Sequence, residues 1–168
     1  MGDVQRAGQV LESVFKDAEL EWESPRAREL RGQAPPRHPQ AVHHGLVPGG
    51  PALPVAERFV IRHPDENEAG VHRWLLERNL RMYGGVSYAV DRLGDIYVTA
   101  RLSLAAVTAE EIDRLLGQVV EAADGAFNTL LELGFASAIR KEYAWRVSRG
   151  ESTRNLDAFT HLIERQAD

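Results

Sequence analysis

The chain of 168 residues contains no cysteine, which excludes disulfide bonds, a thiolate zinc site and a cysteine nucleophile. It also lacks any run of about 20 apolar residues, the length that a membrane-spanning helix needs. The first residues, Met1–Arg6, show no basic stretch followed by an apolar one, so we expect no secretory signal. The formal net charge of −5 makes nucleic acid an unexpected partner. We therefore expect a cytoplasmic protein that does not bind membranes.

The composition is that of a globular protein, with 43% hydrophobic and 27% charged residues, and the length suggests a single domain over residues 1–168. Apolar spacing predicts a helix over residues 3–19 and a short strand at Leu20–Glu23. The segment 27–57 differs from the rest, because it is rich in proline, glycine and histidine and shows neither helical nor strand periodicity. We expect this segment to be irregular.

Regular patterns return at Phe59–Arg62, which predicts a short apolar strand. Asp65 follows as the expected N-cap of a helix, with Glu68 three residues later to complete a capping box. The helix is predicted to run to about Tyr83 and to be well buried, because its apolar arc is wide.

The strongest strand signal is an alternation of apolar and polar residues that predicts an antiparallel hairpin over Val86–Val90 and Ile96–Leu102. Thr108 and Glu111 form a second expected capping box before a long helix. Gly134 is a candidate C-cap or kink in that helix. The remaining predicted elements are helices over residues 135–148 and 156–163.

Four segments resemble the YbjN-domain family as it occurs in actinobacterial proteins: Phe59–Asn67, Trp74–Tyr83, Tyr88–Tyr97 and Asn128–Ala136. The resemblance implies an α+β fold similar to type III secretion chaperones, with an antiparallel sheet packed by helices. The implied order is αβββαββα with extra C-terminal helices. It also implies a non-enzymatic regulatory or chaperone-like protein, and it transfers no catalytic residues.

The segment 27–57 departs from the family pattern, in which two further strands precede Phe59. The family sequence there resembles Leu-Pro-Gly-Thr-Arg-Lys-Leu followed by Thr-Thr-Val. Codons for Pro35–Ala41, read one base later, can encode the first of these, and Val42–Gly45 can supply the second. We hypothesise that this segment is frame-shifted, with an ordinary proline-rich insertion as the alternative. Proline cannot donate to a β ladder, so the second and third strands are expected to be lost or altered.

One cluster could indicate a metal-dependent enzyme. His63, Asp65, Glu68 and His72 are close in sequence, and Glu68 and His72 are four residues apart, as two ligands on one helix face often are. The capping roles expected of Asp65 and Glu68 favour a structural explanation instead. We therefore predict no metal and no cofactor.

A locally basic stretch near the C-terminus, with two interleaved aromatic residues, is the candidate partner surface. A solvated helix face is the alternative explanation. The candidate residues are Arg140, Lys141, Tyr143, Trp145, Arg146 and Arg149.

The favoured function is therefore a chaperone-like or regulatory module that binds a protein partner and is not an enzyme. The metal-dependent enzyme and a frame-shifted paralogue without function of its own are the alternatives. The fold that the family resembles commonly forms homodimers, so a homodimer is a further expectation.

Overall fold

The computed structural model describes residues 2–17, 42–43 and 52–164 of the chain. Within them the helices and strands follow one another in an α-β-β-α-β-β-α-α order, with 3-10 turns on either side of the longest helix. The elements are α1 (Gly2–Asp17), β1 (Val42–His43), β2 (Ala52–Ile61), α3 (Glu68–Asn79), β3 (Val86–Val90), β4 (Ile96–Ser103), η1 (Leu104–Ala106), α4 (Ala109–Arg149), η2 (Arg154–Phe159) and α5 (Thr160–Glu164).

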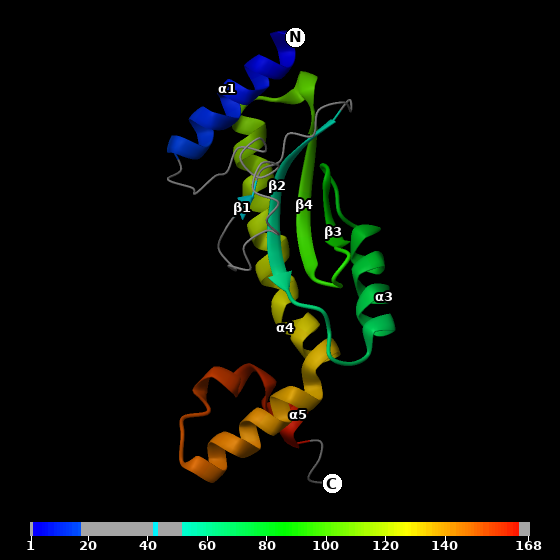
Figure 1. Ribbon diagram of the computed structural model, residues 1–168, viewed down its shortest axis with the longest axis vertical. Coiled ribbons are helices and arrows are strands. Elements are labelled where there is room, and N and C mark those ends of the chain that lie inside the picture. Colours follow the sequence, from blue (N-terminus) through cyan, green and yellow to red (C-terminus); the bar gives the residue numbers. More distant parts are fainter. Residues whose placement is uncertain (1, 18–41, 44–51, 165–168) are drawn as a thin grey trace.

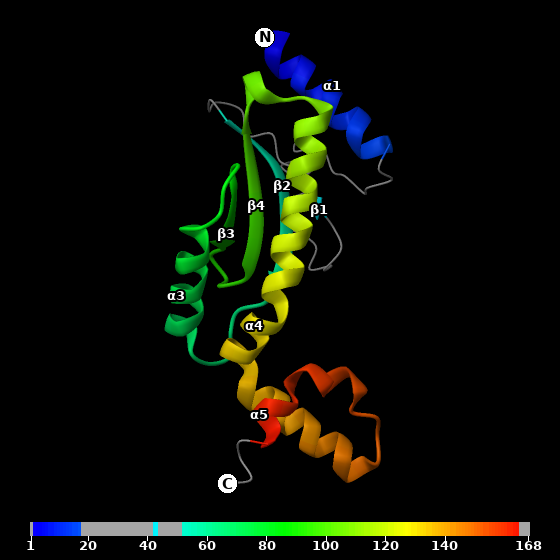
Figure 2. The ribbon, with the colours of Figure 1, turned by 180° about the vertical axis from the view of Figure 1, so that it is seen from behind.

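The strands form an antiparallel sheet in the order β1-β2-β4-β3, and the first half of α4 crosses one face of it (Figure 1; Figure 2). Fully buried side chains of β4 and α4, among them Ile96, Val98 and Leu115, form the core between the two layers. The N-terminal helix α1 adds Ala7 and Leu11 to this core. The predicted α+β class, with an antiparallel sheet packed by helices, is confirmed.

The predicted hairpin is present as β3 and β4, paired from Val86 opposite Ala100 to Val90 opposite Ile96. Its turn is closed by the Asp91 carboxylate, which accepts hydrogen bonds from two backbone N–H groups of the turn at 2.8 and 2.9 Å. The alternation of apolar residues therefore predicted the two strands and their antiparallel pairing.

The strand β2 is longer than predicted, because it begins at Ala52 inside the segment 27–57. Pro54 is accommodated at a register shift between Pro54 and Ala56, where the ladder to β4 is locally interrupted. The expectation of irregular structure is therefore wrong for residues 52–57 and for β1, although β1 is only two residues long. The predicted strand at Leu20–Glu23 and the rest of the segment lie outside the described residues.

The helix α3 begins two residues later than predicted, because its N-cap is residue 67 and not residue 65. Its N-cap is Asn67, in the left-handed conformation at φ 50° and without a side-chain capping bond, so the predicted capping box is wrong. Asp65 instead accepts two hydrogen bonds from the Arg62 guanidinium, at 2.6 and 2.7 Å. Asp65 binds Arg62 and does not cap the helix, because a bidentate ion pair with a guanidinium is stronger than a single hydrogen bond to a backbone N–H.

The predicted deep burial of α3 is also wrong. The helix lies beside β3 at the border of the sheet, so a single stripe with Val71 and Leu75 is buried (Figure 1). Leu76 is 69% exposed and Leu80 is 84% exposed on the outer side. A helix at a sheet border has one neighbouring layer, and its remaining apolar residues stay in solvent.

Asn79, the last residue of α3, binds the border strand β3 directly. Its Oδ1 accepts from the Tyr88 backbone N–H at 2.8 Å, and its Nδ2 donates to the Tyr88 carbonyl at 3.1 Å. The side-chain amide thus occupies backbone groups that a further strand would otherwise pair with.

The long helix α4 is capped as predicted at its start, where the Thr108 hydroxyl accepts from the Glu111 N–H at 3.2 Å. The expected interruption at Gly134 is a kink within one continuous helix, because Phe135 has φ −144°. Gly150, at φ 68°, ends the helix in the left-handed conformation. Beyond the kink, α4 leaves the sheet and forms an arm with η2 and α5 (Figure 2).

The loop after β2 is fixed to the kink by hydrogen bonds. The Gly134 carbonyl accepts from the Asp65 and Glu66 N–H groups at 3.0 and 3.1 Å. The Glu66 carboxylate in turn accepts from the Ser137 N–H at 2.6 Å and from the Ser137 hydroxyl at 2.9 Å. A kink frees both carbonyl and N–H groups of the helix, and this loop satisfies them.

Candidate functional site

The four residues of the suspected metal cluster do not converge on one point. Glu68 Oε1 lies 3.7 Å from His63 Nε2 and 3.9 Å from His72 Nε2, whereas Asp65 is directed toward Arg62. Metal–ligand bonds need donors within about 2–2.6 Å of a common centre. No group of three or more such side chains among residues 2–17, 42–43 and 52–164 is placed to hold an ion. The metal-dependent enzyme has no support in this geometry.

The six residues of the candidate partner surface do not all lie on one face of the arm. Lys141, Trp145 and Arg149 follow one another at four-residue steps and are all exposed, with Trp145 46% exposed. The Arg149 guanidinium lies 5.5 Å from the centre of the Trp145 ring. These three residues form one outward face, which we call the arm stripe.

The other three candidate residues, Arg140, Tyr143 and Arg146, are half-buried. Arg146 pairs with Glu142 at 2.6 Å and donates to the Ser152 carbonyl at 3.1 Å, so it ties the arm together. Tyr143 packs against the small apolar cluster of the arm, which contains Ile139, Leu156 and Phe159.

Arg140 contributes to the electrostatics of the kink. The pKa of Glu66 is lowered chiefly by its hydrogen bonds from Ser137, and the positive charge of Arg140 lowers it further. Arg140 therefore lies near enough to the kink to act on Glu66 through its charge.

A largely apolar groove of about 610 Å³ lies at the kink, between the end of β2, α4 and η2. We call it the kink groove. Its charged residues are Arg62 and Glu142, and both already have partners in Asp65 and Arg146. The apolar side chains that carry the argument below are Phe59, Ile61, Phe127, Leu131, Ile139 and Leu156.

The kink groove continues into the arm stripe along α4. Ala138 and Glu142 line the groove, and Trp145 and Arg149 follow at steps of three and four residues on the same side of the helix. An apolar groove, an exposed indole and a cationic residue therefore lie along one continuous face.

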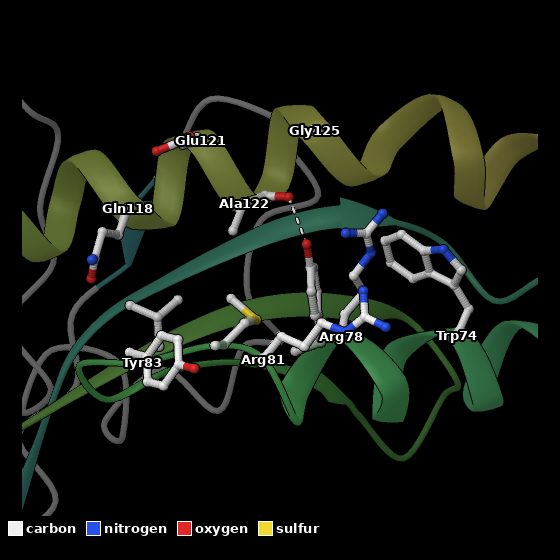
Figure 3. A pocket seen from close by; sticks show the side chains of 11 residues that line it. Trp74, Arg78, Arg81, Tyr83, Gln118, Glu121, Ala122 and Gly125 are labelled. Carbon is white, nitrogen blue, oxygen red and sulfur yellow. Dashed lines mark hydrogen bonds between the residues drawn. The ribbon is translucent and has the colours of Figure 1, made fainter.

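A second, more polar groove of about 460 Å³ lies between the end of α3, β3 and α4, and Figure 3 shows it. We call it the α3 groove. Trp74 and Tyr88 have ring centres 5.7 Å apart, and the Arg78 guanidinium lies 4.9 Å from the centre of the Trp74 ring. The Tyr88 hydroxyl donates to the Ala122 carbonyl at 2.9 Å, which joins β3 to α4 beneath the groove. Burial raises the pKa of Tyr88, partly opposed by the charge of Arg78.

Comparison with known proteins places the sequence in a family. Residues 9–132 match the YbjN family, described as "Putative bacterial sensory transduction regulator". The chain belongs to the YbjN family. An uncharacterised protein of Mycobacterium leprae (strain TN) is 60% identical over 112 residues, which are 67% of this chain and 60% of that protein. An uncharacterised protein of Mycobacterium tuberculosis (strain H37Rv) is 58% identical over 106 residues, 63% of this chain and 57% of that protein. The matches thus span less than two thirds of these relatives.

Among solved structures, a similar chain is the Yersinia pestis type III secretion chaperone SycH, crystallised in complex with a stable fragment of YscM2. The TM-score is 0.46 at 14% sequence identity, covering 71% of this chain and 98% of SycH. Across the part of the chain that the structure describes, none of the helices combines the length and apolar character that crossing a membrane requires.

The two grooves differ in their relation to the YbjN match. The α3 groove is built from residues between Trp74 and Gly125, all within the matched region 9–132. The kink groove straddles its end, because Phe59 and Leu131 lie inside the match whereas Ile139 and Leu156 lie beyond it.

Neither groove was predicted from the sequence, because each is lined by segments that are far apart in the chain. The available signal was local. Trp74 and Arg78 at a four-residue spacing indicate a cation–π pair on one helix face.

Proposed function

We propose that this YbjN protein is a regulatory or chaperone-like module that acts by binding a protein partner and does not catalyse a reaction. The observation that carries the proposal is the continuity of the kink groove with the arm stripe. Membership of a family described as sensory transduction regulators agrees with it.

The kink groove offers the apolar contact area that a protein segment needs. Phe127 is 42% exposed and Trp145 46% exposed, so aromatic surface is accessible at both ends of the continuous face. Aromatic residues at the centre of a protein interface commonly supply much of its binding free energy. Exposed aromatic residues gathered on one face are therefore more informative than apolar residues scattered singly.

The partner segment that this face fits is apolar with acidic residues beside it. Apolar side chains would fill the groove against Leu131 and Ile139. Lys141 and Arg149 flank Trp145 on the arm stripe, and a neighbouring carboxylate would complement their charge.

The lowered pKa values of three carboxyl groups have structural causes. The carboxyl pKa values of Asp65, Glu66 and Glu111 are all lowered, chiefly by hydrogen bonds from Arg62, Ser137 and Arg114 respectively. Each pair fixes a loop or a helix start. Catalytic groups, by contrast, tend to have perturbed pKa values where several of them line one cleft.

The proposal is tested by capturing partners with the intact chain in its native host and comparing variants. Phe127→Ser and Trp145→Ala alter exposed side chains of the continuous face and should leave folding intact. Leu93→Ser is the matched control, because Leu93 is an exposed apolar residue (62%) at the distant hairpin turn. A captured protein is then purified and its affinity is measured by calorimetry.

We expect a directly bound protein whose affinity falls by about tenfold or more for each groove variant and is unchanged for Leu93→Ser. Captured proteins that bind all four chains equally would refute the proposal, as would the absence of any direct binder. A dimer of the chain itself that dissociates in the groove variants would also refute it, since the occupant would then be a second copy.

A further inference from the structure

The α3 groove carries a positive charge in a chain that is negative overall. Arg78 and Arg81 line it, and neither guanidinium has a carboxylate partner among the described residues. Glu121, across the groove on α4, is the single acidic residue of the lining. The groove therefore has a surplus of one positive charge, whereas the whole chain has a formal net charge of −5. This local reversal of sign favours an acidic ligand.

Apolar and aromatic side chains lie beneath these charges. Among the lining residues Val86 is buried, and Met82 and Ala122 are half-buried; we call these three apolar residues the floor. The half-buried aromatic residues Trp74 and Tyr88 also line the groove. Figure 3 shows Trp74 and Arg78 at one end of the groove, and Gln118 and Tyr83 at the other. The groove thus offers guanidinium groups together with space for an apolar side chain.

The groove also contains an acceptor that lacks a donor. The Oε1 atom of Gln118 is buried and has no hydrogen-bond partner in the described structure. This atom has almost no accessible surface, so a ligand N–H group could reach it only after a shift of the Gln118 side chain. A peptide backbone provides such a group at almost every residue.

The dimensions match a short extended segment. Gln118 and Gly125, which line the groove on α4, are seven residues apart, or about 10 Å along a helix, which is the length of about three extended residues. Arg78 lies in the last turn of α3, and Arg81 follows in the turn after the helix, where its N–H donates to the Arg78 carbonyl at 2.9 Å. Alternate residues of an extended strand lie on one side about 7 Å apart. Carboxylates at alternate positions could therefore reach both guanidinium groups.

An open groove also favours a peptide over a small molecule. Small-molecule sites enclose most of their ligand, whereas Arg78, Arg81 and Glu121 are exposed and Tyr83 is 83% exposed at the rim. A bound segment would keep one side in solvent.

We infer that the α3 groove binds an acidic, extended peptide segment of a partner protein, with carboxylates on Arg78 and Arg81 and an apolar side chain on the floor. This site is separate from the kink groove and goes beyond the function proposed above. It lies wholly within the region that matches the YbjN family.

The experiment selects binders from a phage-displayed library of random peptides on the intact chain. Enriched peptides are synthesised, and their binding is measured by fluorescence anisotropy on the wild type and on the double variant Arg78→Gln/Arg81→Gln. The control is Arg73→Gln, an exposed arginine of the same helix that pairs with Glu77 outside the groove. Thermal unfolding verifies that all variants are folded.

We expect enriched peptides to carry Asp or Glu together with an apolar residue at alternate positions. Their affinity should fall about tenfold in the double variant, fall with added salt, and stay within about twofold for Arg73→Gln. No enrichment, peptides without acidic residues, or equal binding by the double variant would each overturn the inference. A negative result here would not change the outcome expected for the kink-groove variants. The two proposals can therefore fail independently of each other.

Discussion

The Glu66 carboxylate connects the loop after β2 to the kinked helix, and Glu66→Gln tests how much its charge contributes. The carboxylate accepts two hydrogen bonds from Ser137, at 2.6 Å from the N–H and 2.9 Å from the hydroxyl. Hydrogen bonds to an ionised group are stronger than neutral ones by about 1 kcal/mol each, and this pair is partly exposed to solvent. We therefore expect Glu66→Gln to lower the free energy of unfolding by about 1 kcal/mol at neutral pH.

The effect should depend on pH in a defined direction. The hydrogen bonds from Ser137 hold the pKa of Glu66 below its ordinary value of 4.5. The charged form stabilises the folded state, so its contribution is complete above pH 4.5 and disappears as the pH falls through the lower, folded-state pKa. Below that point the wild type is protonated and resembles the glutamine variant.

Urea unfolding of both proteins at a series of pH values from 7 to about 3 measures this difference. The control is Glu77→Gln, which removes an exposed i,i+4 ion pair with Arg73 and touches no other element. Ser137→Ala should remove part of the same pH dependence, since it deletes the hydroxyl bond and keeps the backbone one. A stability difference that stays constant down to the lowest pH, or one equal to that of Glu77→Gln, would refute the reasoning.

Two further predictions concern α4. A Cβ at Gly134 would lie 2.9 Å from Pro64 Cβ, so Gly134→Ala should lower the free energy of unfolding by about 1–2 kcal/mol. A Cβ at Gly117 would have nothing within 4 Å, so Gly117→Ala should raise the free energy of unfolding by up to about 1 kcal/mol. Urea unfolding that gave both variants a change of the same sign would contradict this prediction. Thr108→Ala removes the hydroxyl that caps the helix and should cost about 1 kcal/mol in the same assay, while Thr108→Ser should restore most of the loss.

Features set by neighbouring residues could be predicted from the sequence. The hairpin followed from the alternation of apolar residues, the start of α4 from Thr108, and the kink from Gly134. In each case the decisive partners lie within a few residues, so a local pattern contains the necessary information.

Features set by distant contacts could not be predicted in this way. Asp65 has the sequence of an N-cap, but Arg62 binds its carboxylate in the folded chain. The apolar arc of α3 suggested burial, yet burial depends on how many layers surround a helix, and α3 has one. The residues of the arm stripe were among those predicted, but Tyr143 packs against η2 and Arg146 binds the Ser152 carbonyl, contacts that depend on the folded arm.

The segment 27–57 illustrates a different limit. Its proline content argued against strands, yet β2 begins at Ala52 and includes Pro54. The ladder tolerates the missing N–H of this proline because the register shifts beside it. The frame-shift hypothesis stays a prediction. The coding DNA across codons 25–58, compared with that of relatives, tests it through the presence or absence of compensating insertions and deletions.

The contact between Asn79 and Tyr88 has a consequence for how this sheet can grow. β3 is the outermost strand on its side, and such a strand is a template on which other chains can polymerise. The asparagine amide occupies the N–H and C=O in the middle of that template, so an incoming strand would meet a gap in the ladder after one residue pair. A single side chain at the end of α3 therefore disfavours the amyloid-like addition of further strands along β3.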